Sequence, residues 1–173
     1  MATTTSKTPR IVGLITIIAG AIFFVAGAVT WGMVSSNLKA EEITVSEDAA
    51  FLGGATVQDP FSAFAQADII NHHALAGSEG RTYAELGTAI SDAKAAGAAD
   101  DSEEVLDLQK QRNTMMNASF LRASLFTSVV AFGVAALVMG LGVMFVLIGW
   151  AFRKVTVAPV AVSSTTPEVP AQA

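Results

Sequence analysis

The fold is decided by two apolar stretches, IVGLITIIAGAIFFVAGAVTWGMV at residues 11–34 and ASLFTSVVAFGVAALVMGLGVMFVLIGWAF at residues 123–152. Neither stretch contains Lys, Arg, Asp, Glu or His. A helix needs about 20 apolar residues to cross the ~30 Å hydrocarbon layer of a bilayer. Both stretches exceed that length, so the sequence predicts two transmembrane helices separated by an 88-residue segment.

The predicted fold class is an all-α membrane protein, a two-helix transmembrane hairpin with a small, mainly helical extracytoplasmic domain between the spans. The first span follows the basic residues Lys7 and Arg10, as a signal peptide would. Its apolar run is longer than the ~7–15-residue core of such a peptide, which favours a retained anchor. The predicted parts are an N-terminal tail (1–10), the first span (11–34), the domain (35–122), the second span (123–152) and a disordered C-terminal tail (153–173).

The segment between the spans is strongly acidic. It carries fourteen of the fifteen acidic residues and six of the ten basic ones, a net charge of −8. Such a domain is repelled by phosphate groups, which argues against nucleic acid as a partner. The chain has no cysteine, so disulfides, thiolate metal sites and cysteine nucleophiles are all excluded.

Basic residues near the outer ends of the two spans predict the orientation. Lys7 and Arg10 precede the first span, and Arg153 and Lys154 directly follow the second. Segments longer than about 60 residues are translocated with little regard to their charge, so the basic residues of the middle segment count for less. We therefore expect a multi-pass protein of the plasma membrane with both termini in the cytoplasm.

The domain contains three predicted helix starts. Asp59-Pro60 begins a helix that ends near Gly77, and Thr82 with Glu85 forms a capping box for a second. The Ala- and Gly-rich residues 91–100 are expected to be a soft linker. Asp101 with Glu104 begins a third helix that runs into the second span, because no Pro or Gly intervenes.

The apolar content of the domain is low for an independent core. Phe61, Phe64 and Ile69 are predicted to share the apolar face of the first domain helix, and alanine supplies much of the remainder. Small domains bury a limited fraction of their surface. We therefore expect the domain to pack against its own spans or against a partner.

Glycines recur at seven-residue intervals in both spans. The first span has Gly13, Gly20 and Gly27, and the second has Gly133 with Gly140. A further pair, Gly142 and Gly149, has the same spacing. Seven residues make about two helical turns, so each set lies on one face. Small residues let helices approach closely in lipid, and we expect the first five glycines to mediate packing within the hairpin, against other membrane proteins or in self-association.

Candidate sites for chemistry are few. His72 and His73 are the only histidines and cannot both face one metal ion from a regular helix. Asp68 and His72 are four residues apart, and Glu79 follows beyond Gly77, so these three would be the ligands of any metal site. No glycine-rich nucleotide-binding motif is present. The sequence predicts no catalytic residues and no cofactor.

Three strings support a family resemblance. They are IVGLIT at residues 11–16, QADIIN at residues 66–71 and NASFLRASLF at residues 117–126. Together they resemble a family of small two-span bacterial proteins, found especially in actinobacteria and commonly labelled "aromatic ring-opening dioxygenase". Iron-dependent ring cleavage requires a ligand set such as two histidines and a carboxylate at an open site. The sequence does not suggest such a set.

These patterns favour a non-enzymatic membrane accessory protein, a subunit or stabiliser of a larger respiratory, transport or secretion complex. The expected partners are membrane lipid and other membrane helices. An extracytoplasmic module that senses a ligand or a cation is the main alternative, and a membrane-associated ring-opening dioxygenase is a more distant one.

Overall fold

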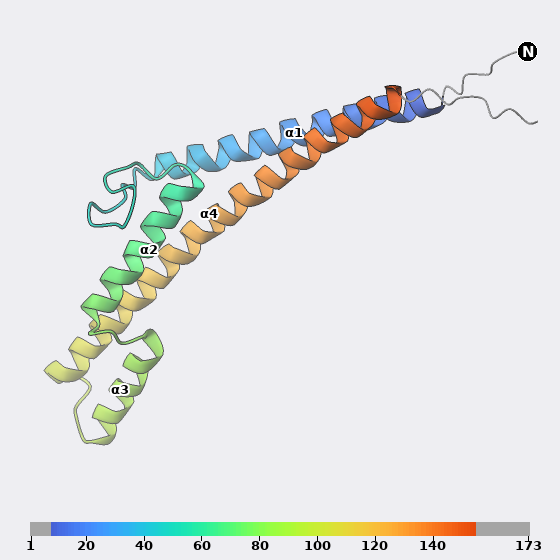
Figure 1. Ribbon diagram of the computed structural model, residues 1–173. Helices are drawn as coiled ribbons and strands as arrows, with labels where there is room; N and C mark the ends of the chain where they lie inside the picture. Colours follow the sequence, from blue (N-terminus) through green and yellow to red (C-terminus); the bar gives the residue numbers. More distant parts are fainter. Residues whose placement is uncertain (1–7, 155–173) are drawn as a thin grey trace, which may run out of the picture.

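The computed structural model describes residues 8–154, and the described chain is helical except for its loops. Its helices are α1 (Thr8–Ala40), α2 (Pro60–Gly77), α3 (Tyr83–Ala95) and α4 (Glu103–Lys154). In Figure 1, α1 and α4 lie side by side near the chain termini and then diverge; α2 lies between the diverging ends, and α3 packs near the start of α4. Both α1 and α4 are long and apolar enough to cross a membrane.

The two long helices extend beyond the predicted spans. α1 already includes residues 8–10 and continues to Ala40, and α4 includes Arg153 and Lys154. The predicted third domain helix and the second span are one continuous helix of 52 residues, as the absence of Pro and Gly before Gly133 suggested. The remaining residues of the two predicted tails, 1–7 and 155–173, lie outside the described range.

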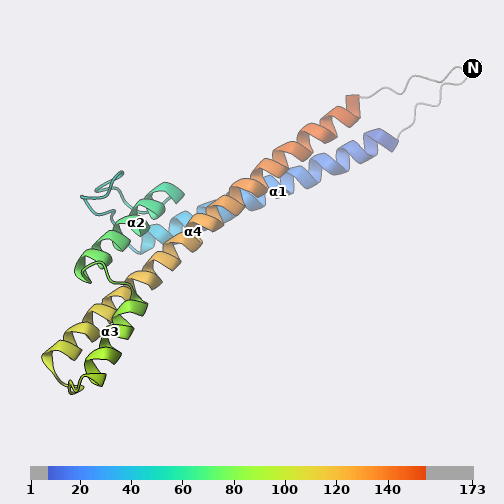
Figure 2. The ribbon, with the colours of Figure 1, turned by 60° about the horizontal axis from the view of Figure 1, so that its bottom comes forward.

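Glycine contacts hold α1 and α4 together in an antiparallel pair. Gly13 faces Gly149, and Gly20 faces Gly142. A methyl group placed on Gly20 would lie 2.5 Å from the carbonyl oxygen of Gly142, so the two backbones are in direct contact. Figure 2 shows the crossing of the same two helices in a second view. The seven-residue spacing repeats this contact every two turns.

The domain helices begin at local caps. The Asp59 carboxylate accepts hydrogen bonds from the backbone N–H groups of Phe61 and Ser62, at 2.8 and 3.0 Å. Thr82 and Glu85 form the predicted capping box of α3. Two predictions were wrong: α3 continues to Ala95 through half of the expected linker, and the hydroxyl of Ser102 accepts from the first turn of α4 where Asp101 was expected to do so.

The loop between α1 and α2 folds back on itself. The N–H of Val45 donates to Ala55, and the N–H of Val57 donates to Ile43, which joins two short extended segments. Val45 and Val57 are almost completely buried. They pack into one apolar cluster together with Leu38 of α1, Ala63, Ala65 and Ala67 of α2, and Leu125 and Phe132 of α4. The loop is therefore part of the core.

A second apolar cluster lies farther along α4. It joins Ala74 of α2, Leu86 of α3, and Leu108, Met115 and Ala118 of α4. Both clusters include residues of α4, and the first also includes α1. The small domain thus shares its cores with the two long helices, which accounts for its low content of bulky apolar residues.

Candidate functional site

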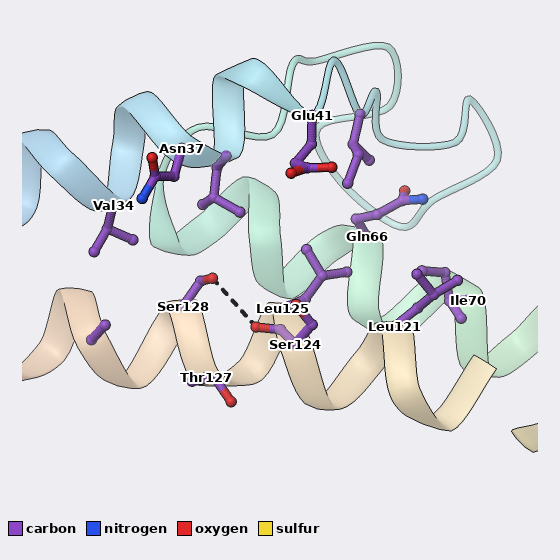
Figure 3. A pocket seen from close by; sticks show the side chains of 13 residues that line it. Val34, Asn37, Glu41, Gln66, Ile70, Leu121, Ser124, Leu125, Thr127 and Ser128 are labelled. Atoms are coloured by element: carbon purple, nitrogen blue, oxygen red, sulfur yellow. Dashed lines mark hydrogen bonds between the residues drawn. The ribbon is translucent and has the colours of Figure 1, made fainter. Parts of the chain in front are cut away.

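A groove of about 570 Å³ lies where α1 and α4 separate. Figure 3 shows α1 above it, α4 below it and α2 between them. Its volume is within the ~300–1,000 Å³ range of small-molecule sites. The lining residues are Val34, Asn37, Leu38, Glu41, Ile43, Gln66, Ile70, Leu121, Ser124, Leu125, Thr127, Ser128 and Ala131.

The groove exists because the small residues of the α1–α4 contact give way to large ones. Beyond Gly27, Trp31 packs on Phe132 with ring centroids 4.7 Å apart. Interaxial distance follows the size of the side chains at the contact, so an aromatic pair separates the helices. The first half of α2 fills part of the gap with alanines, and the groove is the part left open.

Two of the three hydroxyl groups that line the groove from α4 are already hydrogen-bonded. Thr127 donates to the carbonyl oxygen of Ala123 at 2.7 Å, and Ser128 donates to that of Ser124 at 3.3 Å. Each hydroxyl thereby donates its hydrogen bond to the backbone of its own helix, and Figure 3 draws the second of these bonds. With Leu38, Leu125 and Ala131 nearby, this end of the groove presents a largely apolar wall.

The opposite end of the groove carries an acid and an amide, Glu41 and Gln66, and a second amide, Asn37, lies on α1 one turn before Glu41. The side-chain oxygen of Gln66 accepts a hydrogen bond from the N–H of Ser46 at 3.1 Å, which fixes the amide and leaves its NH₂ group as a donor. Asn37 and Glu41 lie on the facing side (Figure 3). Glu41 is the only ionisable residue among those that line the groove. No described cation lies within salt-bridge distance of its carboxylate.

The three predicted metal-ligand residues do not form a site. Glu79 pairs with Arg81 at 2.7 Å, and His72 is exposed. The carboxylate contact is made instead by the neighbouring His73, whose Nε2 lies 2.7 Å from Asp48. Within residues 8–154, no three His, Asp or Glu side chains are placed to hold a metal ion, so Asp68 gains no ligand partners there.

Two exposed hydrogen-bonded contacts in the domain lower the pKa values of Asp48 and Glu85. The hydrogen bond from His73 lowers the pKa of Asp48 and ties the loop to α2. The pKa of Glu85 is lowered by the backbone N–H of Thr82, and then by the Thr82 hydroxyl, at the start of α3. A carboxyl group with a depressed pKa stabilises the fold above its unfolded pKa. That contribution is lost as the pH falls through the folded value.

We expect acid to loosen these two places before the helical cores. Between about pH 5 and pH 3, amide protection factors should fall for residues 46–49 and 82–85, because protonation removes the carboxylate acceptors. Hydrogen exchange, corrected for the intrinsic pH dependence of exchange, measures this. Asp48→Asn should abolish the change in the loop and leave that of α3 intact. Equal protection at both pH values would contradict the assignment.

The predicted packing glycines fall into two groups. Gly13, Gly20 and Gly27 are buried against α4. Gly133 and Gly140 are exposed, and a methyl group on either would meet no atom within 4 Å. Their places in the contact with α1 are taken by Gly142 and Gly149, with Ala135 opposite Gly27. Packing of the exposed pair against another helix stays a prediction.

The predicted apolar face of α2 is divided. Ile69 is 7% exposed and lies in the interior, but Phe61 and Phe64 are 71% and 45% exposed. The buried side of α2 consists mostly of small residues, because the wedge between α1 and α4 is narrow. Phe64 instead contacts the exposed Phe51 and, edge-on, Phe126 of α4.

The sequence did not predict the groove. Its walls come from three segments that meet only after folding, and no motif marks them. The chain matches no protein-family model, and comparison with curated proteins and with solved structures found no significant match.

Proposed function

We propose that this chain is a non-enzymatic accessory protein of the plasma membrane. Its two spans form a hairpin with both termini in the cytoplasm and hold the acidic helical domain on the other side. The face of α4 that carries Gly133 and Gly140 docks onto a helix of a larger envelope complex. The seven-residue glycine pair left exposed on α4 is the observation that carries this proposal.

Membrane insertion is supported by the surface of the two long helices. Large apolar side chains cover their outward faces, for example Ile15 at 61%, Ile22 at 59% and Leu137 at 62% exposure. Monomeric soluble proteins rarely expose apolar surface on this scale. Lipid hydrocarbon covers it without cost. The absence of charged residues from both stretches agrees with the same environment.

Docking is supported by the presence of two glycine faces on one helix. Gly142 and Gly149 are used in the contact with α1, but Gly133 and Gly140 point away from it. Association in lipid depends on close packing at small residues, since hydrophobic attraction between helices is weak there. A second small-residue face therefore suits a second helix, supplied by a partner protein.

We expect Gly140→Leu to release the partner and leave the hairpin intact. A leucine there fills open space within the chain but blocks close approach from outside. The protein should be tagged, extracted gently from native membranes and analysed for stoichiometric companions. Recovery of the companion should fall about tenfold or more, the effect of ~1.4 kcal/mol.

The matched control is Gly32→Leu, since Gly32 is also exposed in open space but lies on α1. It should leave the companion bound. Recovery of the wild-type chain alone, or a companion that tolerates Leu at both Gly133 and Gly140, would refute docking through this face.

A ligand-sensing module is the second candidate, and the groove favours it. The groove adjoins the loop, α2 and both long helices, so an occupant would contact every element of the first apolar cluster.

A further inference from the structure

We propose that the groove binds one molecule of a membrane phospholipid whose headgroup carries a primary amine. This inference rests on the membrane insertion proposed above but needs no partner protein. The chemistry of the two ends of the groove and the position of its opening identify the class of ligand.

The groove runs from membrane depth to the domain. Val34 and Ala131 belong to the apolar stretches 11–34 and 123–152, whereas Glu41 and Gln66 lie outside them. We call the end at Val34 and Ala131 the lower end and the end at Glu41 and Gln66 the upper end. The lower end opens onto the same surface that the hydrocarbon of the bilayer covers. A lipid can enter sideways from that layer, and a soluble ligand would have to displace lipid first.

The lower end suits an acyl chain. Val34, Leu125 and Ala131 provide apolar surface, and the hydroxyls of Thr127 and Ser128 donate to carbonyl oxygens of their own helix. An acyl chain lying there would leave these two hydroxyls with their hydrogen-bond partners, whose loss would be costly. The volume of about 570 Å³ accommodates an elongated apolar group.

The upper end suits a zwitterionic headgroup. The NH₂ group of Gln66 is a hydrogen-bond donor for phosphate oxygens, and that of Asn37, one turn nearer the membrane, is a donor for ester oxygens. The Glu41 carboxylate, which has no cationic partner among the described residues, can accept from an ammonium group. An anionic headgroup would meet this carboxylate in a domain of net charge −8. A quaternary ammonium group has no N–H to donate. The amine lipid satisfies both ends.

The test uses the full chain in mild detergent, depleted of native lipid and then exposed to equal amounts of dioleoyl phosphatidylethanolamine, phosphatidylglycerol and phosphatidylcholine. Native mass spectrometry counts the bound lipid. We expect one retained phosphatidylethanolamine. Its preference over the other two should be about tenfold, as one hydrogen bond to a charged group provides.

Two variants locate the site. Glu41→Gln should remove most of the preference, and Ala131→Trp should abolish retention by filling the groove. Their controls are Glu42→Gln, an equal change of charge at the next residue, and Val130→Trp, which introduces the same large side chain at a neighbouring position that is 64% exposed. Both controls should retain the lipid.

Three results would overturn the proposal: no retained lipid, equal retention of all three lipids, or loss of preference in Glu42→Gln as in Glu41→Gln. Carbonate extraction of the membranes that express each variant reports insertion separately. A chain that resists extraction but retains no lipid refutes the groove ligand alone. A chain that is extracted refutes the membrane proposal beneath it.

Discussion

Gly20→Leu is expected to force α1 and α4 apart and to destabilise the pair. The first added carbon would lie 2.5 Å from the carbonyl oxygen of Gly142 and 2.8 Å from the backbone nitrogen of Val146. Both obstacles are backbone atoms, so no side-chain rotation relieves them. Leucine forms helices better than glycine by ~0.8 kcal/mol, but overpacking typically costs about 1–3 kcal/mol. The clash should therefore outweigh the gain.

Gly140→Leu is the matched control for that experiment. It makes the same chemical change on α4 at a position with nothing within 4 Å, so only the gain in helix propensity remains. The two variants should thus shift stability in opposite directions. Thermal unfolding in detergent can be followed by the fluorescence of Trp31, which packs on Phe132, in a Trp150→Phe background. Equal midpoints for Gly20→Leu and the wild type would show that α1 and α4 do not touch there.

The contrast between these glycines shows which features of the helix packing can be predicted from the sequence. The seven-residue spacing indicates that each set occupies one helical face, and it identified the correct face of α1. On α4 two faces have that spacing, Gly133 with Gly140 and Gly142 with Gly149. Which of the two meets α1 depends on how far α4 is rotated. The same rotation also places Leu125 and Phe132 against α2 and the loop, and these contacts between distant segments are not visible in a local pattern.

The helices of the domain were more predictable than its core. Caps at Asp59 and Thr82 are local signals, because the bonds they make span three residues or fewer. Burial is not local. Phe61 would be an obvious core residue by composition, yet it is 71% exposed, and Ala63 and Ala67 are fully buried. The narrow wedge between α1 and α4 selects small residues, and its width is known only from the assembled fold.

Phe132→Ala is expected to be the most destabilising single truncation on α4. The Phe132 ring is fully buried, packs at a tilt against Trp31 and belongs to the cluster formed with the loop and α2. It lies where the glycine contact ends and the groove region begins, so it supports both. Removing a buried phenylalanine ring typically costs about 3–5 kcal/mol, because a cavity replaces its contacts. Phe132→Leu should cost less, about 1.5 kcal/mol or below, since most of the volume is kept.

Phe120→Ala provides the control, because it removes the same ring from the same helix at a site 67% exposed. Its effect on unfolding free energy should stay within about 0.5 kcal/mol. The residues that lose amide protection distinguish this prediction from that for Gly20→Leu. Phe132→Ala should reduce the amide protection of Val45 and Val57, which share its cluster, whereas Gly20→Leu acts farther along α1. A cost for Phe132→Ala as small as that for Phe120→Ala would mean that α1, α4 and the loop do not share a core, and that the groove lacks the framework that holds it open.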